Sequence, residues 1–187
     1  TGFSDIAGHW GADAITDMNT RNIINGTGDN KFEPNRDITR AEFAAVIVRA
    51  LKLDMKTDTN PFYDVKAEDW YSDYVKTAFS HSLIGGYDGA FNPQLKITRE
   101  EAMAIIARAM DITNLNPDLN EDQIANVLSA FSDENEIANW AQKSVASCIK
   151  TEIISGRDGK TIAPKDNITR AEVAVIIQRL LQKSNLI

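Results

Sequence analysis

Ile38-Thr39-Arg40-Ala41-Glu42, Ile97-Thr98-Arg99-Glu100-Glu101 and Ile168-Thr169-Arg170-Ala171-Glu172 are three copies of one short motif in a chain of 187 residues. A long apolar run follows each copy, so one supersecondary unit is used three times. The copies can therefore be compared with one another, position by position. Residue types that recur are explained by what every copy needs, and departures point to what one copy does differently.

The repeat extends upstream of this motif. A proline lies five residues before each Thr, a tryptophan lies 23 or 24 residues before the proline, and Phe-x-Asp lies upstream of each tryptophan. The recurring positions are Phe3, Phe62 and Phe131; Asp5, Asp64 and Asp133; Trp10, Trp70 and Trp140; and Pro34, Pro93 and Pro164. We predict three repeats, at residues 1–55, 60–112 and 118–187, together forming one compact unit.

The third repeat is longer than the other two. The motif spacing is 59 residues at the first junction and 71 at the second. Part of the extra sequence, around residues 119–128, predicts a short helix with Asn120 as its N-cap and Gln123 three residues on. The third repeat is therefore expected to carry an additional N-terminal helix.

Composition limits the function. The formal net charge is −7, which argues against nucleic acid and anionic membranes as partners, because both attract basic proteins. No apolar stretch approaches 20 residues and no signal peptide is present, so we expect no membrane insertion by this sequence itself. The lone cysteine, Cys148, excludes an internal disulfide and fits a small core position.

Each repeat predicts a helix, a turn and a second helix. The first helix is expected to begin at the tryptophan, with His9, Asp69 or Asn139 as its cap, and to end near a glycine. A turn rich in Gly, Asp and Asn follows, and the second helix opens at the Thr of the motif. The second helices are apolar on almost every face, so we predict an all-α fold with these three helices packed as a central bundle.

The motif combines residues that start a helix with one that does not. Thr at the N-cap and Glu three residues on predict a capping box, and Ile before the cap predicts a hydrophobic staple. Arg at the first helical position instead places a cation at the positive end of the helix dipole, which is unfavourable. We interpret Arg40, Arg99 and Arg170 as ligands for a carboxylate or another small anion beside the helix N-terminal amides. A pair with a local carboxylate such as Asp5, Asp64 or Asp133 is the alternative.

The ordered set of Phe-x-Asp, Trp, a Gly turn, Phe-x-Pro and Ile-Thr-Arg-Ala-Glu, present three times, resembles the S-layer homology (SLH) domain family. The resemblance covers nearly the whole chain. It implies three SLH repeats with pseudo-threefold symmetry in one chain, a monomer built as a pseudo-trimer. It also implies a secreted, non-enzymatic module without cofactor or metal, which anchors an S-layer or surface protein to the bacterial cell wall.

The ligand implied by the resemblance is secondary cell wall polysaccharide, a glycan attached to peptidoglycan. Members of the family often recognise this glycan through its pyruvylated N-acetylmannosamine, in grooves between repeats. The resemblance assigns a binding role to Arg40, Arg99 and Arg170. This agrees with the residues, because an arginine fork suits a ketal carboxylate and an aromatic ring suits the apolar face of a sugar. For Trp10, Trp70 and Trp140, core packing is expected as the main role and sugar contact as a second one.

Other recurring residues have two interpretations. Asp5, Asp64 and Asp133 could accept hydrogen bonds from sugar hydroxyls or could cap the first helix. The glycine-containing turns allow a close approach of backbone to ligand, or serve turn geometry alone. Their residues are Gly26 in repeat 1, Gly86 and Tyr87 in repeat 2, and Gly156 and Arg157 in repeat 3. Arg49, Arg108 and Arg179 recur in the second helices, and we interpret them as residues of the bundle edge.

The repeats are not identical, and we expect unequal sites. Glu100 stands where the other copies have alanine, and it should weaken anion binding at Arg99. Repeat 3 has Ile162 in place of the aromatic residue and Arg157 in its turn. Equal losses in a titration of single Arg→Ala variants with a pyruvylated disaccharide would contradict this prediction.

The residue pattern argues against two other functions and leaves a third open. An EF-hand fails on spacing, because with Gly159 at loop position 6 the first, third and twelfth positions are not carboxylates. A glycosidase needs two carboxylates across a cleft with one pKa raised, and no recurrent apolar setting for such a pair is evident. A protein–protein interaction scaffold of the cell surface remains the main alternative to glycan binding.

Overall fold

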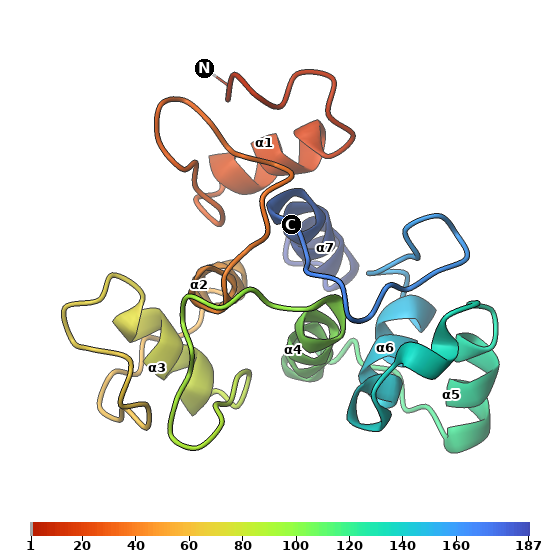
Figure 1. The fold of residues 1–187 in the computed structure, drawn as a ribbon. Coiled ribbons are helices and arrows are strands. Elements are labelled where there is room, and N and C mark those ends of the chain that lie inside the picture. Colours follow the sequence, from red (N-terminus) through yellow and green to blue (C-terminus); the bar gives the residue numbers. More distant parts are fainter. Residues whose placement is uncertain (1) are drawn as a thin grey trace.

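The computed structural model describes residues 2–187 and is all-helical in that range, as predicted. Figure 1 shows three lobes arranged around three central helices, which are the second helices of the repeats. The central helices are α2 (Arg40–Ala50), α4 (Arg99–Ile112) and α7 (Arg170–Lys183). The lobes contain α1 (Ala12–Thr20), α3 (Ser72–Ser80), α5 (Glu121–Leu128), the 3-10 helices η1 (Glu134–Glu136) and η2 (Asn139–Ala141), and α6 (Gln142–Lys150).

The predicted capping boxes are present at all three central helices. Thr39, Thr98 and Thr169 each accept a hydrogen bond from the amide of the motif Glu, whose side chain accepts one from the Thr amide. The predicted helix of the third repeat is also confirmed, with Asn120 and Gln123 forming its capping box. Each cap contributes about 1 kcal/mol to helix stability.

The prediction for the start of the outer helices was wrong. These helices begin two residues after the tryptophan, and no side chain caps them. Trp10 and Trp70 lie instead in turns closed by short-range backbone bonds, Ala12 N to His9 O at 3.0 Å and Ser72 N to Asp69 O at 2.9 Å. Trp140 lies in the 3-10 helix η2, directly before α6. The chain is thus already hydrogen-bonded as a tight turn at the expected cap.

Each outer helix packs against the central helix of another repeat. The helix α3 packs on α2, α6 packs on α4, and α1 packs on α7, which closes the circle. The helix α5 packs on α6 within the third lobe. Every lobe is therefore completed by the preceding repeat, and the three repeats share one apolar core.

A ring of backbone hydrogen bonds joins the three motifs. The Ile38 amide donates to the Ile168 carbonyl (3.1 Å), Ile168 donates to Ile97 (3.1 Å), and Ile97 donates to Ile38 (3.4 Å). The three isoleucine side chains are buried at the same place. The starts of the central helices are thus held at one junction between the lobes.

The aspartates of Phe-x-Asp fix the turn of their own repeat. The Asp64 carboxylate accepts from the amides of Phe91 (2.8 Å) and Asn92 (2.7 Å). Asp5 and Asp133 make the same pair of bonds to their own turns. Partial desolvation opposes ionisation of Asp5, but the two amides outweigh it and lower its pKa. These carboxylates are used inside the fold, but they do not cap the first helix as the structural interpretation expected, because their partners are amides of the turn before the second helix. Binding of sugar hydroxyls stays a prediction.

The recurring turn glycines make room for the phenylalanine of Phe-x-Asp. A Cβ on Gly86 would lie 2.3 Å from the Ala90 carbonyl oxygen and 2.4 Å from the Phe62 ring. Gly26 and Gly156 face the same contacts with Phe3 and Phe131. Turn packing therefore accounts for these glycines, without a ligand.

We expect Gly86→Ala to lower the free energy of unfolding by about 1–3 kcal/mol, because the added methyl meets backbone that cannot yield. Urea denaturation followed by circular dichroism measures the change. The neighbouring Gly85→Ala is the matched control, since nothing lies within 4 Å of its Cβ position, and its effect should stay within about 0.5 kcal/mol. Equal losses in the two variants would contradict this account of the turn.

Cys148 is buried in the core beside the backbone of α4, and burial raises the pKa of its thiol. This agrees with the core position predicted for it. In residues 2–187, no helix combines the length and apolar character needed to cross a membrane.

Candidate functional site

The three motif arginines reach into the next repeat. Arg40 Nε donates to the Phe91 carbonyl (2.8 Å) and Nη2 to Gly85 (3.1 Å). In the same way Arg99 reaches Ile162 and Ser155, and Arg170 reaches Phe32 and Asn25. Each guanidinium thus ties the start of one central helix to the turn of the following lobe.

Each arginine also faces the capping glutamate of the next repeat. Arg99 Nη1 lies 2.8 Å from Glu172 Oε1, Arg170 Nη1 lies 3.5 Å from Glu42, and Arg40 Nη1 lies 3.8 Å from Glu101. Arg99 and Arg170 are only 2% and 3% exposed. Burial lowers the pKa of all three arginines, and the facing glutamates oppose that shift.

These contacts revise the hypothesis of an anion site at free helix amides. The first two amides of α2 donate to the carbonyls of Leu95 and Pro93 in the next repeat, and α4 and α7 do the same. The third amide of each helix is used by the capping Thr. The motif arginines are therefore interrepeat contacts first. The alternative of an intramolecular carboxylate pair holds, but the partner is the capping Glu of the next repeat and not the Phe-x-Asp carboxylate.

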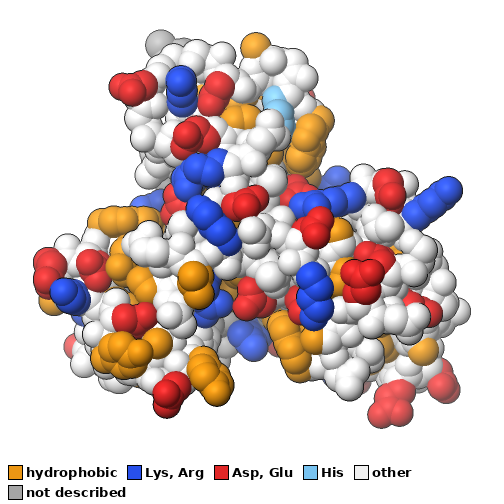
Figure 2. Space-filling view, in the orientation of Figure 1, with side chains coloured by type: hydrophobic (Ala, Val, Ile, Leu, Met, Phe, Trp, Pro, Cys, Tyr) orange, Lys and Arg blue, Asp and Glu red, His pale blue; other side chains and the backbone are white. Residues whose placement is uncertain are grey.

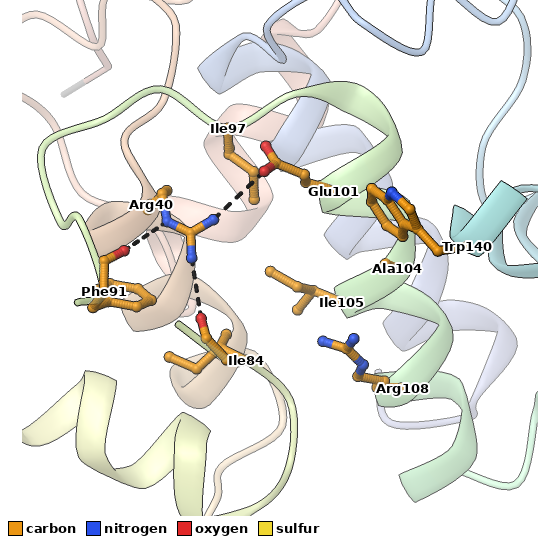
Figure 3. A pocket seen from close by; sticks show the side chains of 10 residues that line it. Arg40, Ile84, Phe91, Ile97, Glu101, Ala104, Ile105, Arg108 and Trp140 are labelled. Carbon is orange, nitrogen blue, oxygen red and sulfur yellow. Dashed lines mark hydrogen bonds and ion pairs between the residues drawn. The ribbon is translucent and has the colours of Figure 1, made fainter. Parts of the chain in front are cut away.

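A groove nevertheless lies at each of the three interrepeat junctions, beside a motif arginine. We call them the Arg40, Arg99 and Arg170 grooves, with volumes of about 210, 510 and 370 Å³. Each is lined by the motif arginine of one repeat, by the turn, capping Glu and second-helix arginine of the next, and by the tryptophan of the third. Figure 3 shows Arg40, Glu101, Arg108 and Trp140 around the first of them.

The tryptophans correct the prediction that core packing is their main role. Trp10, Trp70 and Trp140 are 64%, 58% and 60% exposed. Trp140 lines the Arg40 groove, Trp10 the Arg99 groove and Trp70 the Arg170 groove. Their place in the turn before the outer helix keeps the rings outside the core, where each offers an apolar face to a groove.

The second-helix arginines also line the grooves, which sequence reasoning missed. Arg108, Arg179 and Arg49 each keep one hydrogen bond, to Leu83 O, Ile153 O and the Tyr74 hydroxyl respectively. Their recurrence nine residues after the motif arginine was the available signal. Every groove consequently has more arginines than carboxylates in its lining, although the chain is acidic. Figure 2 shows charged side chains gathered where the lobes meet.

The remaining sequence candidates divide between groove and surface. Gly26, Gly156 and Arg157 line grooves, whereas Gly86 packs on Phe62 and Tyr87 is 84% exposed beyond the lining of the Arg40 groove. Glu101, Glu172 and Glu42, assigned only to capping, line a groove as well.

Glu100 is placed differently from our expectation. It is buried, lies 2.5 Å from Lys165 Nζ and accepts from the Ala138 amide at 3.0 Å. Its charge is therefore neutralised at the contact with the third repeat, and it is absent from the lining of the Arg99 groove. The physical reason given for a weaker Arg99 site does not hold, whereas the inequality of the sites stays a prediction.

We expect the domain to lose stability in acid through Glu42 and Glu172. Burial opposes their ionisation, but Arg36 on Glu42, Arg157 on Glu172 and the capping amides outweigh it and hold both pKa values below the usual 4.5. A depressed pKa gives stability that is present above the unfolded value and is lost as pH falls through the folded value. Urea unfolding between pH 7 and pH 3 should show this loss below about pH 4.5, and Glu42→Gln should reduce the slope there. An unchanged slope would contradict the assignment.

Fold and grooves together define a repeat-built binding module, with three related sites made by neighbouring repeats. The profile of the S-layer homology domain matches residues 2–44, 61–103 and 130–174. The chain belongs to the S-layer homology domain family, as its sequence predicted. SLH domains are anchoring modules rather than catalytic ones, and membership supports attachment at the bacterial cell wall or surface.

Relatives extend well beyond this region. The chain is 39% identical over 182 residues to an amylopullulanase of Thermoanaerobacterium thermosulfurigenes, covering 97% of this chain and 10% of that protein. It is 37% identical over 183 residues to the exoglucanase XynX of Acetivibrio thermocellus, covering 98% and 16%. A surface-layer 125 kDa protein of Lysinibacillus sphaericus is 29% identical over 184 residues, covering 96% and 15%. The chain thus spans only a small part of these relatives.

Proposed function

We propose that this module binds secondary cell wall polysaccharide non-covalently, through an acidic sugar such as pyruvylated N-acetylmannosamine, in the grooves between repeats. The observation that carries the proposal is the recurrence, at all three junctions, of an exposed tryptophan face opposite a pair of arginines. A sugar with a carboxylate has an apolar ring face and an anionic group, which these two features complement.

Within a groove, the arginines have different tasks. The motif arginine is largely used by backbone carbonyls and the facing Glu, so it shapes the groove wall. The second-helix arginine makes one hydrogen bond in the described part of the chain and keeps other N–H donors for a carboxylate. Because this attraction is local, the overall negative charge of the chain is no obstacle.

Three grooves on one chain suit a repeating polymer. Binding of one unit raises the effective concentration of the next, so weak sites together give firm attachment. The protein that carries this module, an S-layer protein or an exoenzyme, would thereby be retained on the envelope. We propose that the module acts as a monomer, because one chain supplies all three repeats.

Purified cell walls test the proposal. We expect the module to sediment with walls that retain their polysaccharide, and to stay in solution after mild acid has removed the pyruvate ketals. Walls re-extracted without acid are the control for glycan loss. Binding that persists after complete glycan extraction would instead favour the protein interaction scaffold.

A further inference from the structure

The three grooves differ at two positions of their rims. In the Arg99 groove, Arg157 lies 3.0 Å from Glu172, and in the Arg170 groove, Arg36 lies 2.6 Å from Glu42. These arginines come from different positions of the repeat and meet the equivalent capping glutamate. In both grooves the glutamate is therefore held by two arginines.

Repeat 2 has no arginine at either position, and the residues that stand there do not line the Arg40 groove. Tyr87 is the counterpart of Arg157, since each follows the packed turn glycine and closes the turn with its amide. Leu95 is the counterpart of Arg36, because their carbonyls accept from the first amides of α2 and α7. Tyr87 and Leu95 are 84% and 60% exposed, and the lobe that carries them shows broad hydrophobic areas in Figure 2.

The glutamate of this groove is correspondingly less engaged. Glu101 Oε2 accepts from the amide and the hydroxyl of Thr98. Among residues 2–187, no hydrogen-bond donor reaches Glu101 Oε1, and its nearest cation is Arg40 Nη1 at 3.8 Å. The side chain of Glu101 is 38% exposed, against 14% for Glu172. Figure 3 shows the Oε1 oxygen of Glu101 joined only to Arg40, by the 3.8 Å ion pair, so it keeps room for a further hydrogen-bond donor.

We infer that the Arg40 groove is specialised for an uncharged sugar, while the Arg99 and Arg170 grooves take the acidic one. A carboxylate brought to Arg40 would lie beside the Glu101 oxygen, which in residues 2–187 pairs with no second arginine, because Arg108 lines the groove without an ion pair to Glu101. A sugar hydroxyl would instead donate to Glu101 Oε1, with the sugar ring against Trp140. This inference rests on the proposed function and assigns a ligand to each groove.

The groove volumes agree with this division. The Arg40 groove is the smallest, at about 210 Å³ against 510 and 370 Å³. A pyruvate ketal adds a second ring to the sugar, so the smaller groove suits the unsubstituted residue. Two kinds of site on one chain would then match a polymer in which acidic and neutral sugars alternate.

The tryptophans make each groove separately observable. The chain has three tryptophans and each lines a different groove, so their indole N–H signals in a ¹⁵N-correlated NMR spectrum report the grooves one by one. Single Trp→Phe variants assign them. The probes are the methyl glycoside of N-acetylmannosamine and its pyruvate ketal. We expect the neutral glycoside to move the Trp140 signal, and the ketal to move those of Trp10 and Trp70, with about tenfold preferences.

Substitution of Tyr87 and Leu95 by arginine tests whether the missing arginines cause the preference of the Arg40 groove for a neutral sugar. Tyr87→Arg combined with Leu95→Arg should shift the Trp140 response toward the ketal by about tenfold. The control Tyr87→Thr, which installs the residue of repeat 1 and adds no cation, should not strengthen binding of the ketal. If all three signals prefer the ketal equally and the exchange changes nothing, the inference is overturned and the proposed function stands. If no signal responds to either sugar, the proposed function fails and the inference fails with it.

Discussion

Replacement of Arg99 or Arg170 by alanine is expected to lower the free energy of unfolding by about 3–5 kcal/mol, because a buried partner of an ion pair is removed. Arg99 is 2% exposed and ties α4 to the third lobe through Ile162 O and Glu172. Its loss would leave buried carbonyls without donors and Glu172 with one arginine fewer. Arg170 has the same place between α7 and the first lobe.

The loss of stability should be larger for a motif arginine that is more buried and makes shorter contacts. Arg40→Ala is expected to cost less, because its side chain is more exposed and its distance to Glu101 is 3.8 Å. Arg179→Ala is the matched control within the Arg99 groove, since its one hydrogen bond is 3.4 Å long. Chemical denaturation of the four variants measures the differences. Arg99 and Arg179 variants of equal stability would show that the motif arginine is not an interrepeat tie.

This expectation changes how binding losses at the motif are interpreted. A variant of Arg99 or Arg170 that fails to bind cell walls would report loss of the groove wall as well as loss of a ligand contact. Arg→Ala titrations at these positions therefore do not measure ligand contacts alone. Second-helix arginines and the tryptophans are the better probes, because they line the grooves and carry less of the fold.

Local rules predicted the starts of the central helices correctly. A capping box needs only Thr, the Glu three residues on and the apolar run that follows, all within one segment. The same holds for the cap at Asn120. The motif arginine was singled out as a residue that does not help to start its own helix, but its partners lie 45 to 145 residues away in sequence. No spacing rule identifies such partners.

The exposure of the tryptophans could not be read from periodicity. Trp10 precedes Ile15 and Met18 at spacings that suit one helix face, yet the helix begins only at Ala12. The turn before it rotates the ring out of the core. Likewise, the repeats predicted three helix pairs, but not that each outer helix packs on the central helix of the preceding repeat. A helix that packs within its own repeat and one that packs on a neighbouring repeat have the same apolar pattern.

Removal of all three groove tryptophans should abolish anchoring while the fold remains. For Trp10→Ala, Trp70→Ala and Trp140→Ala combined, we expect retention on isolated cell walls to fall by about 10²–10⁴, because avidity multiplies the loss at each site. Each ring is more than half exposed, so each substitution should change the free energy of unfolding by no more than about 0.5 kcal/mol. Sedimentation with walls and urea denaturation measure the two effects.

The single variants decide whether the grooves act together. Each single Trp→Ala variant should weaken retention by about tenfold or less, and losses should grow with each further substitution, since the remaining grooves still hold the polymer. Tyr63→Ala is the control, because its ring is 77% exposed but lines none of the three grooves. A single variant as weak as the triple one would mean that one groove carries the binding. Equal retention by all variants would mean that the tryptophan faces do not contact the wall, and the attachment surface would then lie outside the grooves.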